Sequence, residues 1–171
     1  MKICHISDVR IRNYRYHTEY KEVFKQLYEK LEEIKPDIIV NTGDTAHTKL
    51  QLSPSYFHMS AKLFENLANI APLHIILGNH DLNLRNIAKI DAITPVVEAL
   101  NHKDIHFHKY SQEVDLGNGF IFNVMSIVDE DQWIRPTNRD KVNIALFHGS
   151  VAGVETDTGW IMEHGDIDIK K

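Results

Sequence analysis

The chain has 171 residues, of which 43% are hydrophobic and 25% are charged, so we expect one domain with a sizeable core and exclude wholesale disorder. The net charge of −5 excludes a uniformly basic coat for nucleic acid and leaves room only for a local basic groove. The single cysteine, Cys4, excludes an internal disulfide framework, and no apolar run approaches the ~18 residues of a membrane span, so a cytoplasmic protein is expected.

Short apolar segments alternate with helical periodicity through the first hundred residues. Buried parallel strands are predicted at 2–7, 37–42 and 73–78. Amphipathic helices are predicted at 20–34, at 53–70 and, interrupted near Thr94-Pro95, at 87–100. The second of these helices begins at Ser53-Pro54, because serine caps a helix and proline suits its first turn.

The remainder of the chain has the pattern of strands, which are predicted at 105–110, 113–116, 120–128 and 143–148. Gly117-Asn118-Gly119 is a hairpin signal between two of them. His106 and His108 fall on one face of the first, which we interpret as a solvated strand face. A βαβαβ beginning followed by a strand-rich half predicts an α/β fold with two packed mixed sheets flanked by helices.

Residue types that bind metals or move protons gather where the predicted strands end. In chain order they are Asp8, Asp44, Asn79-His80-Asp81 and His148. In open α/β sheets, ligand sites lie beyond the carboxyl ends of the strands. Carboxylate and amide oxygens together with imidazoles suit divalent metal ions. The sequence therefore predicts a metal site at this edge of the sheets.

The same residues resemble a known family in their order and strand context. Asp8, Gly43-Asp44, Gly78-Asn79-His80-Asp81 and His148 are similar to the motifs of the calcineurin-like metallophosphoesterases. Segments 2–8, 43–47 and 78–81 look most like the SbcD-type nuclease subunits that process DNA breaks. The resemblance implies a calcineurin-like α/β/β/α sandwich over residues 1–171 and metal-dependent phosphodiester hydrolysis at DNA ends.

The resemblance also implies how the metal site is built. Two divalent ions would lie side by side, bridged by Asp44, with Asp8 on the first ion and Asn79 and His148 on the second. Manganese is the ion that the resemblance favours, while the ligand types also admit magnesium, iron and zinc.

Three further residues receive catalytic roles from the resemblance. His80 would stabilise or protonate the leaving oxygen, and Asp81 would hold the His80 imidazole in the useful tautomer. His47 would help to place the DNA strand. The implied partners are DNA, a coiled-coil ATPase of the SbcC type and a second copy of the chain in a homodimer.

Two departures from the family pattern bear on activity. The first motif of the family reads Asp-x-His, whereas this chain has Asp8-Val9-Arg10. A guanidinium has no free lone pair and carries a fixed positive charge, so Arg10 cannot be a ligand and opposes a cation. The family's later Gly-x-His-x-His-like element does not occur before Lys171, so its ligands are expected to be missing from residues 1–171. We hypothesise a metal-poor chain with weak activity or none.

The segment after the first predicted strand alternates basic and aromatic residues. Arg12, Tyr14, Arg15 and His17 form a candidate nucleic-acid-binding loop, since basic residues follow phosphates and aromatic rings stack on bases. A solvated loop with its tyrosines resting on the sheet explains the same residues. Two alternative functions also stay open: a metallophosphoesterase for nucleotides or phosphoproteins, and a non-catalytic module that binds DNA ends or a partner.

Overall fold

The computed structural model describes residues 1–49, 51–133 and 135–168. Its first half alternates strands and helices. In chain order these are β1 (Ile3–Ile6), α1 (His17–Ile34), β2 (Ile38–Asn41), α2 (Pro54–Ile70), β3 (Leu73–Ile76), α3 (Thr94–Leu100) and β4 (Ile105–His108). The four strands form a parallel sheet in the order β1-β2-β3-β4.

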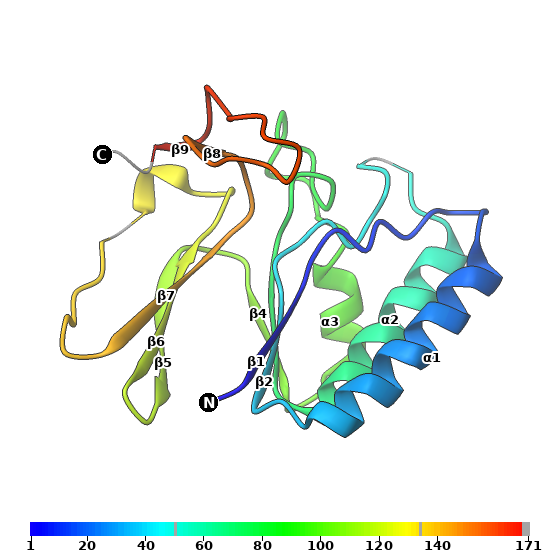
Figure 1. Cartoon of the computed structure of the whole chain (residues 1–171). Helices are drawn as coiled ribbons and strands as arrows, with labels where there is room; N and C mark the ends of the chain where they lie inside the picture. Colours follow the sequence, from blue (N-terminus) through cyan, green and yellow to red (C-terminus); the bar gives the residue numbers. More distant parts are fainter. Residues whose placement is uncertain (50, 134, 169–171) are drawn as a thin grey trace.

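The helices lie together on one face of this sheet, on the side away from the second sheet (Figure 1). The expected start of α2 is confirmed, because the side chain of Ser53 accepts a hydrogen bond from the backbone N–H of Tyr56 and Pro54 lies in the first turn. α3 is shorter than the predicted 87–100 helix and begins at Thr94. The prediction failed for 87–93, where hydrogen-bonded turns such as Lys89 N–H to the Asn86 carbonyl take the place of a helix.

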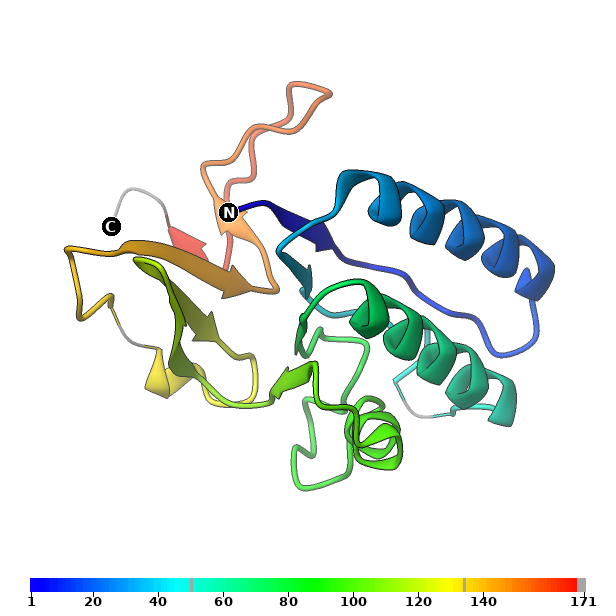
Figure 2. The same cartoon turned by 90° about the horizontal axis from the view of Figure 1, so that it is seen from below.

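The second half of the chain forms a smaller, mixed sheet. Its elements are β5 (Gln112–Gly117), β6 (Phe120–Met125), the short 3₁₀ helix η1 (Glu130–Gln132), β7 (Val142–Phe147), β8 (Val151–Ala152) and β9 (Ile167–Asp168). β5 and β6 pair antiparallel across the predicted glycine hairpin, and β6 pairs parallel with β7. β8 and β9 form a separate two-stranded pair, and the segment between them projects away from both sheets (Figure 2).

Two apolar layers hold the molecule together. The larger one lies between the parallel sheet and the helices and includes the fully buried Tyr56, Phe64 and Leu67. The smaller one joins the two sheets through Ile38, Val40, Ile76, Phe122, Val124 and Leu146. The predicted α/β architecture of two packed sheets is therefore confirmed, with two differences. The first sheet is wholly parallel and not mixed, and the described residues after Leu100 contain no α-helix.

The prediction of a solvated strand face holds for His106, which is exposed, and fails for His108. His108 is buried, and its Nε2 lies 2.9 Å from Nδ1 of the buried His74. The ring of His106 lies 4.7 Å from that of His74 on the neighbouring strand. On this sheet face the second sheet packs against His74 through Phe122, so burial extends to His108 but leaves His106 exposed. Among the described residues, no helix combines the length and the apolar character that spanning a membrane requires.

Candidate active site

The candidate site lies where the loops after β1 and β2 run side by side beyond the strand ends. The backbone N–H of Asp8 donates to the Gly43 carbonyl at 3.0 Å, and that of Arg10 donates to the Asp44 carbonyl at 3.0 Å. Asp8, Arg10 and Asp44 all have left-handed backbone conformations, with φ of 54°, 54° and 55°. Such conformations are uncommon for side chains with a Cβ and are typical of functional loops, where the surrounding structure holds them.

Two glycines allow the loops after β2 and β3 to meet. Gly43 has a φ of +98°, and a Cβ there would overlap the backbone nitrogen of Gly78. A Cβ on Gly78 would in turn overlap the backbone nitrogen and the carboxylate of Asp44. Because only glycine leaves this space free, the two positions bring the Asp44 carboxylate against the loop that carries Asn79 and His80.

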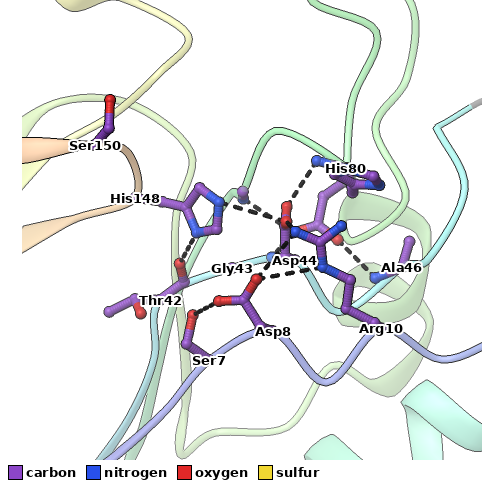
Figure 3. A network of polar contacts seen from close by, with 12 residues as sticks. Ser7, Asp8, Arg10, Thr42, Gly43, Asp44, Ala46, His80, His148 and Ser150 are labelled. Carbon is purple, nitrogen blue, oxygen red and sulfur yellow. Dashed lines mark hydrogen bonds and ion pairs between the residues drawn. The ribbon is translucent and has the colours of Figure 1, made fainter. Parts of the chain in front are cut away.

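The carboxylate of Asp44 is at the centre of the site and has no exposed surface. Its Oδ1 accepts a hydrogen bond from the backbone N–H of His80 at 2.7 Å. Its Oδ2 lies 2.5 Å from Nη2 of Arg10 and 3.5 Å from Nε2 of His148, yet neither contact has hydrogen-bond geometry (Figure 3). Burial would raise the pKa of Asp44, but the contacts from His148, the His80 N–H and Arg10 outweigh burial and lower it.

Arg10 joins the two carboxylates that the family resemblance assigns to the first metal ion. Its Nε and Nη2 donate to Oδ1 of Asp8 at 3.3 and 3.1 Å, while Nη2 also faces Asp44. The hydroxyl of Ser7 donates to the other oxygen of Asp8 at 2.7 Å. The guanidinium therefore supplies positive charge between Asp8 and Asp44 (Figure 3).

The family resemblance predicts that Asp81 holds the His80 imidazole, but this prediction is wrong, because the Asp81 carboxylate binds backbone groups instead. It is fully buried and accepts three backbone hydrogen bonds, from Asp44 at 2.8 Å, Gly78 at 2.9 Å and Ala46 at 2.9 Å. Burial raises the pKa of Asp81 to about 7, although the three N–H donors act in the opposite direction. Asp81 is thus a positioning residue that fastens the loops after β2 and β3 to one another.

His80 is oriented by backbone and not by a carboxylate. Its Nδ1 donates to the carbonyl of His47 at 2.8 Å, which leaves Nε2 directed away from that bond. The His47 ring lies 6.5 Å from the His80 ring, and the buried Nδ1 of His47 has no hydrogen-bond partner among the residues that the structure describes. Burial, Arg12, His80 and Arg10 lower the pKa of His47. The structure therefore places His47 and His80 side by side.

His148 comes from the end of β7 and completes the polar cluster. Its Nδ1 donates to the Thr42 carbonyl at 2.7 Å, so its Nε2 faces Asp44. The neighbouring Asp44 carboxylate raises the pKa of His148, although burial opposes the shift. Asp8, Asn79 and His148 line one cavity of about 570 Å³ together with Arg10. The four predicted metal residues thus meet at one place, as the strand-end argument predicts.

The basic and aromatic loop leads from this cavity to α1. Tyr14 is 80% exposed and Arg15 is also exposed, whereas the guanidinium of Arg12 lies 5.8 Å from the ring centre of Tyr16. Because Tyr14 is so exposed, it does not rest on the sheet, and the alternative of a loop whose tyrosines pack on the sheet does not apply to this residue. His17 is different, because its Nε2 donates to the Arg12 carbonyl at 2.8 Å and so fixes the loop from within.

Sequence reasoning missed the residues that act through backbone groups. The carbonyls of Thr42 and His47 orient His148 and His80, and Ser7 holds Asp8. A carbonyl is present in every residue, so no side-chain pattern could point to Thr42. The serine directly before Asp8 was visible, but its contact depends on the turn that follows β1.

The residues present fit one divalent cation better than two. Toward the second position, His148 Nε2 lies 3.5 Å from Oδ2 of Asp44, the oxygen that also faces Arg10, and Asn79 lines the adjoining cavity. At the first position the Arg10 guanidinium already pairs with both carboxylates. Within residues 1–49, 51–133 and 135–168, no three His, Cys, Asp or Glu side chains group as a metal-binding set.

A two-sheet α/β sandwich with carboxylates and imidazoles at its strand ends defines a candidate metal-dependent enzyme. The model of the calcineurin-like phosphoesterase family matches residues 1–168, so the chain belongs to this family, whose members hydrolyse phosphoesters with divalent metals. The chain is 36% identical over 176 residues to the uncharacterized protein R555 of Acanthamoeba polyphaga mimivirus. That match covers 95% of this chain, which spans 13% of the length of the relative.

Proposed function

We propose that this chain is the phosphoesterase domain of an SbcD-type DNA nuclease, which cleaves phosphodiester bonds at DNA ends with a divalent cation, manganese being the favoured ion. The observation that supports this proposal is a juxtaposition. Arg10 lines the polar cavity and lies two residues before Arg12, so a DNA strand with a phosphate in the cavity would continue along the loop that carries Arg12, Tyr14 and Arg15. Basic residues beside exposed aromatic rings suit a nucleic-acid strand.

Asp44, Asn79 and His148 are the residues that would hold the cation. When bound, such a cation supplies an activated water and polarises the phosphoryl oxygen. The chain's own residues contribute the remainder. His80, held by its Nδ1 bond to the His47 carbonyl, keeps Nε2 available to hold a proton for the leaving oxygen. Arg10 adds fixed positive charge, which favours phosphate over neutral ligands.

The proposal includes the partners that the family resemblance implies. DNA would approach over the loop 12–17, where Tyr14 and Arg15 are exposed. An SbcC-type coiled-coil ATPase and a second copy of the chain would complete the assembly. Because the matched relative is much longer than this chain, these interactions belong to the proposal for the whole protein.

The direct test compares substrates in manganese-containing buffer with the protein in excess. End-labelled duplex DNA should be shortened, and the change His80→Gln should slow this by about 10²-fold, since positioned acid–base groups contribute 10²–10⁴-fold. The exposed His58, which lies on α2, provides the control change His58→Gln. If nucleotides or a small phosphodiester are cleaved while the DNA stays intact, the result would instead favour another kind of phosphoesterase.

A non-catalytic DNA-end-binding module is the second candidate, and the ion pairs of Arg10 favour it. A guanidinium that forms ion pairs with both Asp8 and Asp44 leaves fewer carboxylate ligands for a catalytic metal ion. The change Arg10→His separates the two functions. Gain of DNA cleavage in this variant supports the nuclease, whereas DNA binding without cleavage in both proteins supports the module.

A further inference from the structure

We propose that the Arg10 guanidinium is a resident cation of the site, which replaces one of two metal ions, so that this chain binds a single divalent ion. The inference rests on the proposed function for its metal chemistry, but not on DNA as the substrate. It explains why a residue that cannot bind metal occupies a position between two carboxylates.

The first argument is the charge around Arg10. Asp44 is completely buried, and a buried carboxylate without a positive partner is strongly unfavourable. Arg10 Nη2 is 2.5 Å from Oδ2 of Asp44 and 3.1 Å from Oδ1 of Asp8. One guanidinium thus contacts both carboxylates and cancels one of the two negative charges, whereas a divalent ion would cancel both.

The second argument is that the backbone holds Arg10 in this place. Its N–H donates to the Asp44 carbonyl, and its own carbonyl accepts a hydrogen bond from the Tyr20 hydroxyl at 2.7 Å. The next residue, Ile11, is 1% exposed and its N–H donates to the Thr45 carbonyl at 2.8 Å. With both neighbouring peptide groups held by hydrogen bonds, the Cα of Arg10 is fixed beside the two carboxylates. It is therefore a built feature and not a surface side chain that happens to lie nearby.

The third argument is that His148, which faces the same Oδ2 of Asp44 that Arg10 contacts, keeps a ligand atom for a metal ion. His148 donates from Nδ1 to Thr42, so Nε2 with its lone pair in the neutral ring faces Oδ2 of Asp44. Asn79 is exposed and lines the same cavity. One carboxylate oxygen, one imidazole nitrogen and one amide oxygen suit a single divalent ion that completes its shell with water.

Two explanations of Arg10 give different results on substitution. If Arg10 matters only as a missing ligand, then lysine and glutamine in its place should behave alike, because neither is an imidazole. If its charge replaces an ion, lysine should preserve the behaviour of the wild type, whereas glutamine should leave Asp8 and Asp44 without compensation and in need of a cation.

The experiment measures Mn²⁺ stoichiometry by equilibrium dialysis and electron paramagnetic resonance, together with Tm in Mn²⁺ or EDTA. We expect the wild type and Arg10→Lys to bind one ion with an uncoupled spectrum. Arg10→His should bind a second ion, with an affinity at least about tenfold higher than any second-ion binding by the wild type, and should show spin coupling. The Tm rise with Mn²⁺ should be about 5 °C larger for Arg10→Gln than for the wild type. Arg139→His, an exposed change in the loop before β7, is the control.

Each other outcome overturns the inference. A wild-type chain with two spin-coupled ions shows that Arg10 leaves the first position open, and a wild-type chain without any bound Mn²⁺ excludes the single-ion site. Equal Tm responses of Arg10→Gln and the wild type show that the charge replaces nothing. All readouts are independent of DNA cleavage, so failure of the nuclease proposal alone would leave these results unchanged. Circular dichroism of each variant excludes loss of folding as their cause.

Discussion

The Arg10 guanidinium lies 2.5 Å from Oδ2 of Asp44, a carboxylate that has no exposed surface. The side chain of Arg10 remains 35% exposed, so the pair lies at the floor of the cavity and not deep in the core. Its two partners are unequal, because the side chain of Asp8 is 53% exposed and can be solvated on its own. Stability of the site in the absence of metal therefore depends on Arg10 more than on Asp8.

The change Arg10→Ala should lower the free energy of unfolding by about 3 kcal/mol in EDTA, because it leaves the buried Asp44 without its nearest positive charge. Asp8→Ala should cost less than about 1 kcal/mol, since exposed ion pairs contribute little. Urea denaturation of both variants checks the difference. Equal losses would show that burial of Asp44 is compensated by its bond from the His80 N–H and by His148 without help from Arg10.

Close approach of two loops makes Gly78 sensitive to substitution. Gly78→Ala should cost about 3 kcal/mol or more, because its Cβ meets the backbone and carboxylate of Asp44, which Asp81 holds in place. Gly119→Ala is the matched control, since that residue has a φ of +83° but open space around it and should cost only about 1–2 kcal/mol. The comparison, made by thermal denaturation, separates steric contact from backbone strain. Similar losses in the two variants would contradict the contact argument.

Much of the fold follows from local patterns, whereas the errors arise from tertiary contacts. The first three strands are confirmed because each is short, apolar and followed by a polar loop. The periodicity at 87–93 predicted helix, but Asp91 accepts hydrogen bonds from the N–H groups of Ile93 and Thr94 and starts α3 there. A side-chain acceptor of this kind favours a helix start over a helix interior.

The site shows the same division between pattern and contact. The strand ends predict four candidate metal ligands; Asp8, Asn79 and His148 line one cavity, and the buried Asp44 lies beside it in contact with Arg10 and His148. The role of Asp81 was not predictable from its place beside His80, because its carboxylate points back to the backbone of Ala46 and Asp44. The departure at Arg10 was visible in the sequence, but its pairing with Asp44 depends on two left-handed turns that come together.

Two buried histidines predict acid sensitivity. Burial lowers the pKa of His74 to about 3 and that of His108 to about 4. The unfolded chain binds these protons near pH 6.5, so stability is fully present above that pH and is lost as the pH falls toward 4. Each histidine contributes a slope of up to about 1.4 kcal/mol per pH unit. Urea midpoints measured between pH 7 and 4 check this fall.

The change His74→Phe should flatten that slope, because a ring that cannot bind a proton replaces one that must stay neutral beside Phe122. His58→Gln is the control, since His58 is exposed and its removal should leave the slope unchanged. A pH profile of His74→Phe that is as steep as that of the wild type would assign the acid sensitivity to other groups.

DNA binding should depend on the exposed part of the loop before α1. Arg15→Ala should weaken binding at low salt and reduce the slope of log K against log salt by about 1, because one phosphate contact is lost. Tyr14→Ala should cost about 1–3 kcal/mol of binding to single-stranded ends with the salt slope unchanged, since stacking releases no counterions. Arg139→Ala, which removes an exposed arginine elsewhere, is the control for net charge. Fluorescence anisotropy over a salt series measures all three. An equal loss of DNA affinity in Arg15→Ala and Arg139→Ala would mean that only the overall charge matters. The loop would then have no specific role in DNA binding.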